Sequence, residues 1–130
     1  MPDGKRKVLF VDDDPSMVKM YGKRFETAGY HVLTAGDGEE ALATIAGERP
    51  DVVVLDIELP KLNGYEVCAR VKQRQETKHI PVVMFTAKGQ PQEHVAGLML
   101  GADVYVSKSC QAKALLDQVE RMLANRPAAG

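Results

Sequence analysis

Three consecutive aspartates, Asp12, Asp13 and Asp14, follow a short apolar run at residues 8–11. Adjacent carboxylates repel one another, and a carboxylate near an apolar environment loses hydration. A cation, a helix N-terminus or solvent must offset this cost. Asp14 precedes Pro15, a pair that is typical of a helix N-cap followed by the first helical residue. Asp12 and Asp13 are left for another role.

Three further polar side chains stand where other predicted strands end, namely Asp56, Thr86 and Lys108. Open α/β sheets bind ligands outside the carboxyl ends of their strands. Carboxylates that converge at such an edge suit a hard divalent cation such as Mg²⁺. With a hydroxyl and an ammonium group beside them, they predict phosphoryl chemistry, with a carboxylate nucleophile, a metal ion and donors for the phosphoryl oxygens. Each residue alone would be an ordinary turn or surface residue, so the prediction depends on their joint position.

The elements that must position these side chains follow from the hydrophobic pattern. Runs rich in β-branched residues predict five strands, at residues 6–11, 31–35, 51–56, 81–86 and 103–107. Three of these runs are almost continuously apolar, as in parallel strands that are covered on both faces. Apolar stripes at helical spacing lie between or after the strands, as in Met17, Tyr21, Phe25 and Ala28, in Val67, Cys68 and Val71, in Val95, Leu98 and Met99, and in Leu115, Leu116, Val119, Met122 and Leu123. Five βα units in a row predict one doubly wound α/β layer.

Local signals predict where two of the helices begin or end. Gly29 is placed to stop the first helix. Asp37 and Glu40 have the spacing of a capping box, and Gly47 ends the helix that they open.

Composition limits the class of protein. The 130 residues suit one domain, with 45% hydrophobic and 27% charged residues. Seventeen basic against eighteen acidic residues argue against direct nucleic-acid binding. The sequence has no signal-peptide core and no apolar stretch near the roughly 18 residues that span a bilayer, so we expect no membrane contact. Cys68 and Cys110 are far apart, and we expect free thiols in a reducing cytoplasm.

Four segments, VDDDP, DVVVLDIELPKLNGYE, PVVMFTA and GLMLGADVYVSK, resemble the receiver domain of bacterial two-component response regulators, the family of chemotaxis-type receivers, in order and spacing. The resemblance extends from about residue 5 to residue 124. We therefore expect a receiver domain at residues 1–125 and a tail or the start of a linker at residues 126–130. The resemblance implies a flavodoxin-like (βα)5 fold, a doubly wound parallel sheet of order 2-1-3-4-5.

The resemblance also implies roles for the residues at the strand ends. Asp56 is the phosphoacceptor, which takes a phosphoryl group from a phosphohistidine on a sensor histidine kinase or phosphotransfer protein. Asp13, Asp56 and the backbone carbonyl of Glu58 bind Mg²⁺, and Asp12 assists, often through water. Lys108 contacts the phosphoryl group.

Switching and lifetime involve further residues. By the resemblance, Thr86 bonds the phosphoryl group once it is formed, and Tyr105 matches the switch aromatic whose rotamer follows Thr86. The surface that changes comprises the fourth helix, the fifth strand and the fifth helix. We expect it to contact an output partner or a fused effector domain, or to form a dimer that depends on phosphorylation. Glu58 and Lys88 lie two residues beyond Asp56 and Thr86, and we expect this pair to tune the phosphoryl lifetime. Two solvated surface charges, worth under about 1 kcal/mol as a pair, are the alternative interpretation.

The sequence departs from the family pattern after Lys108. Most receivers have proline next, joined by a cis peptide, whereas this chain has Ser109. A non-proline cis bond costs roughly 2.5–4 kcal/mol, so the sequence leaves a cis and a trans Lys108–Ser109 peptide open. Cys110 replaces a common aromatic at the next position.

Two other functions would use some of the same residues. Phosphohydrolases of the haloacid-dehalogenase type also combine Asp, Thr or Ser, and Lys with Mg²⁺, but their nucleophile follows the first strand rather than the third. A pseudo-receiver that only binds partners usually lacks the acceptor or an acidic residue, and here all are present. We therefore expect a signalling domain and not an enzyme, apart from self-catalysed phosphoryl acceptance and loss. A stand-alone receiver and the N-terminal domain of a larger regulator fit the sequence equally well.

Overall fold

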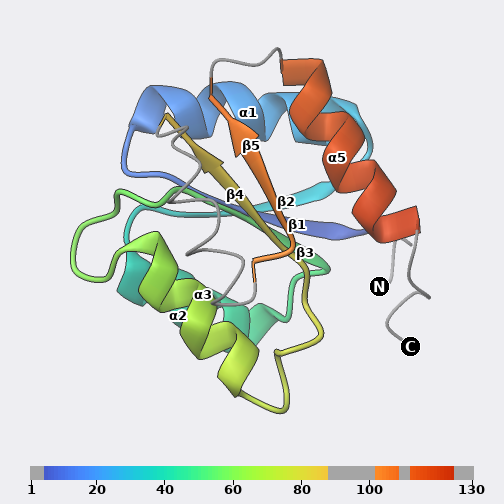
Figure 1. Cartoon of the computed structure of the whole chain (residues 1–130). Coiled ribbons are helices and arrows are strands. Elements are labelled where there is room, and N and C mark those ends of the chain that lie inside the picture. Colours follow the sequence, from blue (N-terminus) through green and yellow to red (C-terminus); the bar gives the residue numbers. More distant parts are fainter. Residues whose placement is uncertain (1–4, 88–101, 109–111, 125–130) are drawn as a thin grey trace.

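The computed structural model describes residues 5–87, 102–108 and 112–124, without the side chain of Thr86. Five parallel strands form one sheet in the order β2-β1-β3-β4-β5 (Figure 1). Their bounds are β1 (Lys7–Val11), β2 (His31–Ala35), β3 (Val52–Leu55), β4 (Val82–Thr86) and β5 (Val104–Ser107). The expected flavodoxin-like doubly wound sheet is confirmed, and each strand ends within one residue of its predicted bounds.

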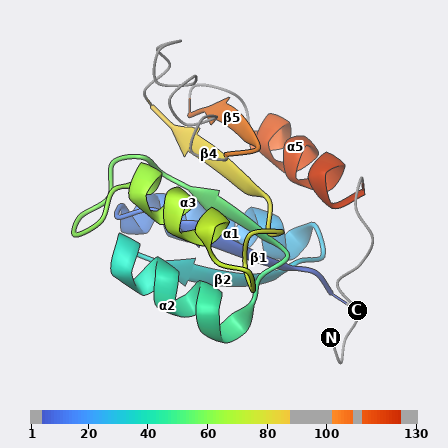
Figure 2. The same ribbon diagram turned by 60° about the horizontal axis from the view of Figure 1, so that its bottom comes forward.

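Four described helices cover the two faces of the sheet, namely α1 (Pro15–Thr27), α2 (Gly38–Glu48), α3 (Gly64–Gln73) and α5 (Ala112–Ala124). Figure 2 shows α1 and α5 on one face and α2 and α3 on the other. The helix predicted from Val95, Leu98 and Met99 lies outside the described residues.

The core has two layers because successive strand side chains point to opposite faces. In β1, Leu9 and Val11 belong to the layer beneath α2 and α3. Val8 and Phe10 belong to the layer beneath α1 and α5. The ring of Phe10 stacks on that of Tyr21 of α1, with 5.4 Å between their centroids. Burial on both faces explains why the central strands are almost continuously apolar.

Most predicted helix ends are confirmed. Gly29 has a left-handed φ of 101° after α1. Asp37 caps α2 and accepts a 2.8 Å hydrogen bond from the Glu40 amide. The Glu40 side chain accepts a hydrogen bond from the amide of Gly36, one residue before the cap. The predicted end at Gly47 was wrong, because α2 runs to Glu48 and the left-handed residue is Arg49, with a φ of 49°.

Arg49 is held in this conformation by contacts that its side chain makes. Its guanidinium donates hydrogen bonds to the carbonyls of Ala46 and Glu76, each at 3.3 Å. Its amide donates to the carbonyl of Ile45 at 3.0 Å. The bonds to Ile45 and Ala46 satisfy carbonyl groups at the helix end, and together with the bond to Glu76 they offset the cost of a left-handed conformation in a residue other than glycine.

An ion pair aligns β4 and β5 at the end of the sheet opposite to the aspartates. The Lys72 ammonium donates to the Asp103 carboxylate at 3.0 Å and to the carbonyl of Ile80 at 2.7 Å. The same Asp103 oxygen accepts a 2.7 Å hydrogen bond from the amide of Val82. One side chain from α3 thus ties the starts of two neighbouring strands.

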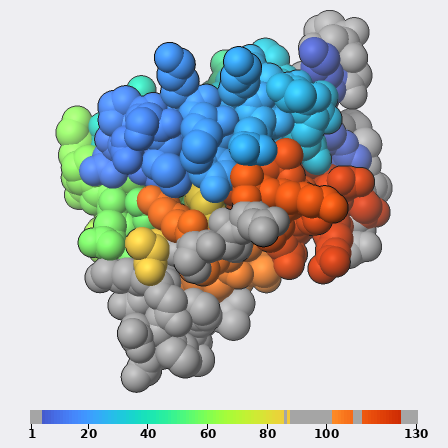
Figure 3. Space-filling model, turned by 90° about the horizontal axis from the view of Figure 1, so that it is seen from above, coloured from blue at the N-terminus to red at the C-terminus, as the bar shows by residue number. Residues whose placement is uncertain are grey.

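On the face shown in Figure 3, α1 and α5 lie next to one another. A groove between them is lined by Met20, Lys23, Arg24, Thr27, Ala28 and Leu116. Met20 is 45% exposed. None of the described helices is both long enough and apolar enough to cross a lipid bilayer.

Candidate functional site

Sheet topology brings Asp12 and Asp56 together at one edge. Asp12 directly follows β1 and Asp56 directly follows β3. These strands pair in parallel with Val11 opposite Leu55, so the two aspartates leave the sheet side by side. The Asp56 amide donates to the carbonyl of Val11 at 3.2 Å, which continues the pairing to Asp56.

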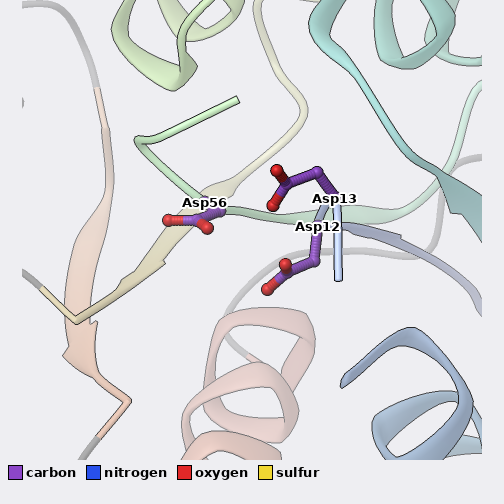
Figure 4. A group of neighbouring side chains, drawn as sticks. All are labelled: Asp12, Asp13 and Asp56. Carbon is purple, nitrogen blue, oxygen red and sulfur yellow. The ribbon is translucent and has the colours of Figure 1, made fainter. Parts of the chain in front are cut away.

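Asp12, Asp13 and Asp56 form a compact group of carboxylates (Figure 4). One carboxylate oxygen from each lies within 4.8 Å of the others. Asp12 is 2% exposed and Asp56 is 6% exposed, whereas Asp13 is exposed to solvent. Clustered carboxylate oxygens are the ligands that hard divalent cations prefer, so the donor set fits Mg²⁺.

Lys108 supplies the positive charge of this site. It directly follows β5, and its ammonium group lies 2.8 Å from Oδ2 of Asp12 and 3.0 Å from Oδ2 of Asp56. The Lys108 side chain therefore bridges two buried carboxylates whose strands are not its neighbours in the sheet. Hydrogen bonds between charged groups are stronger than neutral ones, particularly away from water.

Backbone amides bind the other oxygen of each buried carboxylate. The Asp14 amide donates to Oδ1 of Asp12 at 3.0 Å, and the Glu58 amide donates to Oδ1 of Asp56 at 3.3 Å. In both cases an aspartate accepts from the residue two positions later, as in an Asx turn. Our sequence reasoning missed these two donors, although aspartate at a strand end is a known signal for such a turn.

Burial and the Lys108 ammonium group shift the pKa of Asp56 in opposite directions. Loss of hydration raises the pKa of Asp56, and the contact with Lys108 only partly opposes this. Burial also disfavours the charge of Lys108, but its hydrogen bonds to Asp12 and Asp56 outweigh that effect and raise the pKa of Lys108. The lysine therefore stays protonated throughout the physiological range.

Asp14 has a different role from its two neighbours. Its carboxylate accepts hydrogen bonds from the Ser16 amide at 3.0 Å and from the Ser16 hydroxyl at 2.7 Å. These bonds lower the pKa of Asp14 and cap α1, with Pro15 at the first helical position. The predicted role of Asp14 as the N-cap of α1 is therefore confirmed.

The other predicted site residues are described only in part. Thr86 is the last residue of β4, and its backbone pairs with Ser107 of β5. Tyr105 is partly buried and packs against the layer beneath α2 and α3. Glu58 is exposed. Lys88 lies outside the described residues, so its pairing with Glu58 stays a prediction.

Ser109 and Cys110 also lie outside the described residues. The structure therefore does not test whether the Lys108–Ser109 peptide is cis or trans. Cys68 is buried, as expected from its place on the apolar stripe of α3.

Residues 8–120 match the family model of the response regulator receiver domain. The chain belongs to the response regulator receiver family. It is therefore a phosphoacceptor domain of two-component signalling, as the resemblance of its motifs implied.

Named relatives and solved receiver structures agree with this assignment. The alkaline phosphatase synthesis transcriptional regulatory protein PhoP of Bacillus subtilis is 43% identical over 118 residues, which cover 91% of this chain and 48% of that protein. The chain spans about half the length of the curated relatives it matches. The chemotaxis response regulator CheY4 of Vibrio cholerae superposes with a TM-score of 0.86 at 34% identity, over 92% of this chain and 99% of CheY4.

A further solved structure is the CheX–CheY–BeF3–Mg²⁺ complex of Borrelia burgdorferi. A chain of this complex superposes with a TM-score of 0.85 at 30% identity, over 93% of the present chain and 92% of its own. That receiver fold was thus crystallised with a fluoroberyllate and Mg²⁺.

Asp56→Asn should stabilise the metal-free receiver at neutral pH. Because folding raises the pKa of Asp56, the folded chain binds this proton more tightly than the unfolded chain. In the wild type, the contribution of Asp56 to the free energy of unfolding is therefore complete below about pH 4, where free aspartate is protonated. This contribution is lost as pH rises through the raised pKa. Asparagine does not ionise and avoids the loss. Urea unfolding of both proteins in EDTA, from about pH 3 to pH 8, measures the difference.

Asp14→Asn is the control, because folding lowers the pKa of Asp14 whereas it raises that of Asp56. The lowered pKa of Asp14 contributes stability above the pKa of free aspartate, and this contribution is lost as pH falls through the lowered value. The advantage of Asp56→Asn should thus grow with pH, whereas Asp14→Asn should show a deficit at neutral pH that disappears in acid. An Asp56→Asn advantage that is equal at every pH, or largest in acid, would contradict the raised pKa.

Proposed function

We propose that this receiver accepts a phosphoryl group on Asp56 from a phosphohistidine of a sensor histidine kinase or phosphotransfer protein. The observation that carries the proposal is the contact of Asp56 with the Lys108 ammonium, in a cluster with Asp12 and Asp13. Asp56 is buried and follows the central strand β3, whereas Asp12 and Asp13 both follow β1.

In this transfer, a carboxylate oxygen of Asp56 forms a bond to the phosphorus while the P–N bond of the donor histidine breaks. The donor imidazole keeps the electron pair of that bond, and an acyl phosphate forms on Asp56. Lys108 already lies 3.0 Å from Asp56, so its ammonium group is close enough to bind an oxygen of the transferred group. Thr86, at the end of β4, is the proposed second donor to that group.

We propose Asp13, Asp56 and the Glu58 carbonyl as the ligands of Mg²⁺, with Asp12 assisting. The three carboxylates provide hard oxygen donors, and the exposure of Asp13 gives the cation access from solvent. Bound Mg²⁺ neutralises negative charge on phosphoryl oxygens. Three carboxylates against one ammonium leave two negative charges, which match the charge of one divalent cation.

Phosphorylation is proposed to change the surface formed by the fourth helix, β5 and α5. A new dianion on Asp56 attracts the Thr86 hydroxyl, and Tyr105 turns into the space that Thr86 leaves. The partly buried packing of Tyr105 supports this role, because such a ring can exchange between an inner and an outer position. Glu58 and Lys88 remain the proposed pair that sets the lifetime of the phosphoryl group.

The output partner is proposed to be an effector that controls transcription, on the same or another chain. PhoP is a transcriptional regulatory protein about twice as long as the segment matched here, which supports this choice. Any contact with DNA would then belong to the effector, consistent with the balanced charge of the receiver itself. A dimer that forms on phosphorylation is compatible with the same scheme.

A phosphohydrolase of the haloacid-dehalogenase type has less support. Its nucleophile follows the first strand of its sheet, whereas Asp56 follows β3. We therefore propose no turnover of free phosphate esters beyond acceptance and loss of the phosphoryl group. The intact set of three aspartates and Lys108 also favours phosphorylation over a pseudo-receiver that only binds partners.

Asp56→Asn is expected to abolish phosphorylation, because an amide is not a nucleophile for phosphoryl transfer. The wild type, incubated with a small phosphodonor and Mg²⁺, should gain the mass of one phosphoryl group by intact-mass spectrometry. Asp51→Asn is the matched control, since Asp51 precedes β3 at the opposite end of the strand. It should accept one group as the wild type does. Equal incorporation in Asp56→Asn and the wild type would exclude Asp56 as the acceptor.

Asp13→Asn is expected to weaken Mg²⁺ binding by at least about tenfold, since loss of a group that merely orients a ligand already costs 10 to 100-fold. Asp14→Asn should leave the Mg²⁺ affinity nearly unchanged, because Asp14 caps α1 and is not a proposed ligand, and asparagine can also cap a helix. Calorimetric titration with MgCl₂ compares the two variants with the wild type. An equal loss of Mg²⁺ affinity in both variants would show that Asp13 and Asp14 do not have the separate roles proposed, as a metal ligand and as a helix cap.

A further inference from the structure

The loop between β3 and α3 rests on the first residue of α2. The Gly38 amide donates to the carbonyl of Pro60 at 3.3 Å, and the Leu62 amide donates to the same carbonyl at 2.8 Å. Beside this contact, the Lys61 ammonium lies 3.7 Å from Oδ2 of Asp37, the N-cap of α2. The loop that follows the acceptor is thus held against the N-terminus of another helix.

The contact at Gly38 leaves no space for a side chain. A Cβ atom built on Gly38 would lie closer than 3.0 Å to three atoms of Leu62, namely its carbonyl oxygen, its Cβ at 2.5 Å and its carbonyl carbon at 2.9 Å. Two of these atoms belong to the backbone, so a rotamer change cannot relieve the clash. Gly38 does not have a left-handed φ, so what this position requires is space and not conformational freedom.

The other end of the same loop is fixed at the site. The Gly64 amide donates to the carbonyl of Ile57 at 2.7 Å, and the Glu58 amide donates to Oδ1 of Asp56. Only Leu59, Pro60 and Lys61 separate Glu58 from Leu62, and Lys61 is already in a left-handed conformation, with a φ of 71°. A short loop with one proline and one strained residue has little freedom to absorb a displacement, so a shift of Leu62 reaches Glu58.

We infer that Gly38 is a positioning residue for the metal site, because its lack of a side chain lets the loop that carries the Glu58 carbonyl, a proposed Mg²⁺ ligand, pack against α2. The inference rests on the proposed Mg²⁺ site. It assigns a role in cation binding to a residue on α2, a helix that contributes none of the proposed ligands.

Gly38→Ala tests the inference, with Gly47→Ala as the matched control on the same helix. A Cβ on Gly47 would meet no described atom within 4 Å apart from its chain neighbours and the backbone of its own helix. Because alanine favours helix over glycine, Gly47→Ala also provides a stabilised background for the double variant Gly38→Ala/Gly47→Ala. The measurements are Mg²⁺ affinity by calorimetry and, without metal, the amide chemical shifts of Glu58 and Leu62.

We expect Gly47→Ala to bind Mg²⁺ like the wild type and the double variant to bind about tenfold more weakly, the loss typical when a group that orients a ligand is changed. The Glu58 amide should shift in the double variant and not in Gly47→Ala. At saturating Mg²⁺, phosphorylation of the double variant should recover to the wild-type rate.

Equal Mg²⁺ affinity in Gly47→Ala and the double variant would overturn the inference. A double variant that does not fold, or whose slow phosphorylation excess Mg²⁺ cannot restore, would also overturn it, since Gly38 would then serve the packing of the fold. If the wild type and Gly47→Ala bind no Mg²⁺, the proposed metal site itself is wrong.

Discussion

The ammonium group of Lys108 lies between two buried carboxylates, and the arrangement of the site depends on this contact. Without it, Asp12 and Asp56 would place two negative charges side by side with almost no hydration. Burial raises the pKa of Asp56, and the Lys108 ammonium opposes this only in part, so one cation does not fully compensate the two buried carboxylates. The remaining negative charge gives the site its proposed affinity for a divalent cation, and Lys108 keeps a positive charge beside Asp56, the proposed acceptor.

The fold provides what this contact needs. Lys108 is 96 residues from Asp12 in the sequence, and the parallel sheet brings them to 2.8 Å because both lie at the carboxyl ends of its strands. Two layers of apolar side chains hold the strands in register. The loop after Asp56 is then seated on Gly38 and Gly64, where no larger residue fits. In this account the proposed chemistry depends on close backbone packing as well as on charge.

Much of this arrangement could be predicted from the sequence. The apolar runs predicted the strands and therefore the residues at their carboxyl ends, and the order of the sheet followed from the family resemblance. The amide donors of Asp14 and Glu58 were missed, because they depend on the path of the backbone after each aspartate. The close approach of Gly38 to Leu62 was missed because it joins segments that no local pattern relates.

The coupling of Lys108 to its two carboxylates is measured most directly by a mutant cycle in EDTA. Lys108→Met should lower the free energy of unfolding by at least about 2 kcal/mol in the wild type, since removing one member of a buried charged group leaves the others unpaired. In the Asp12→Asn/Asp56→Asn background the same substitution should change it by less than about 0.5 kcal/mol. Lys72→Met, whose partner Asp103 is remote from the carboxylate cluster, should lower the free energy of unfolding by the same amount in both backgrounds. An equal effect of Lys108→Met in the two backgrounds would contradict the account.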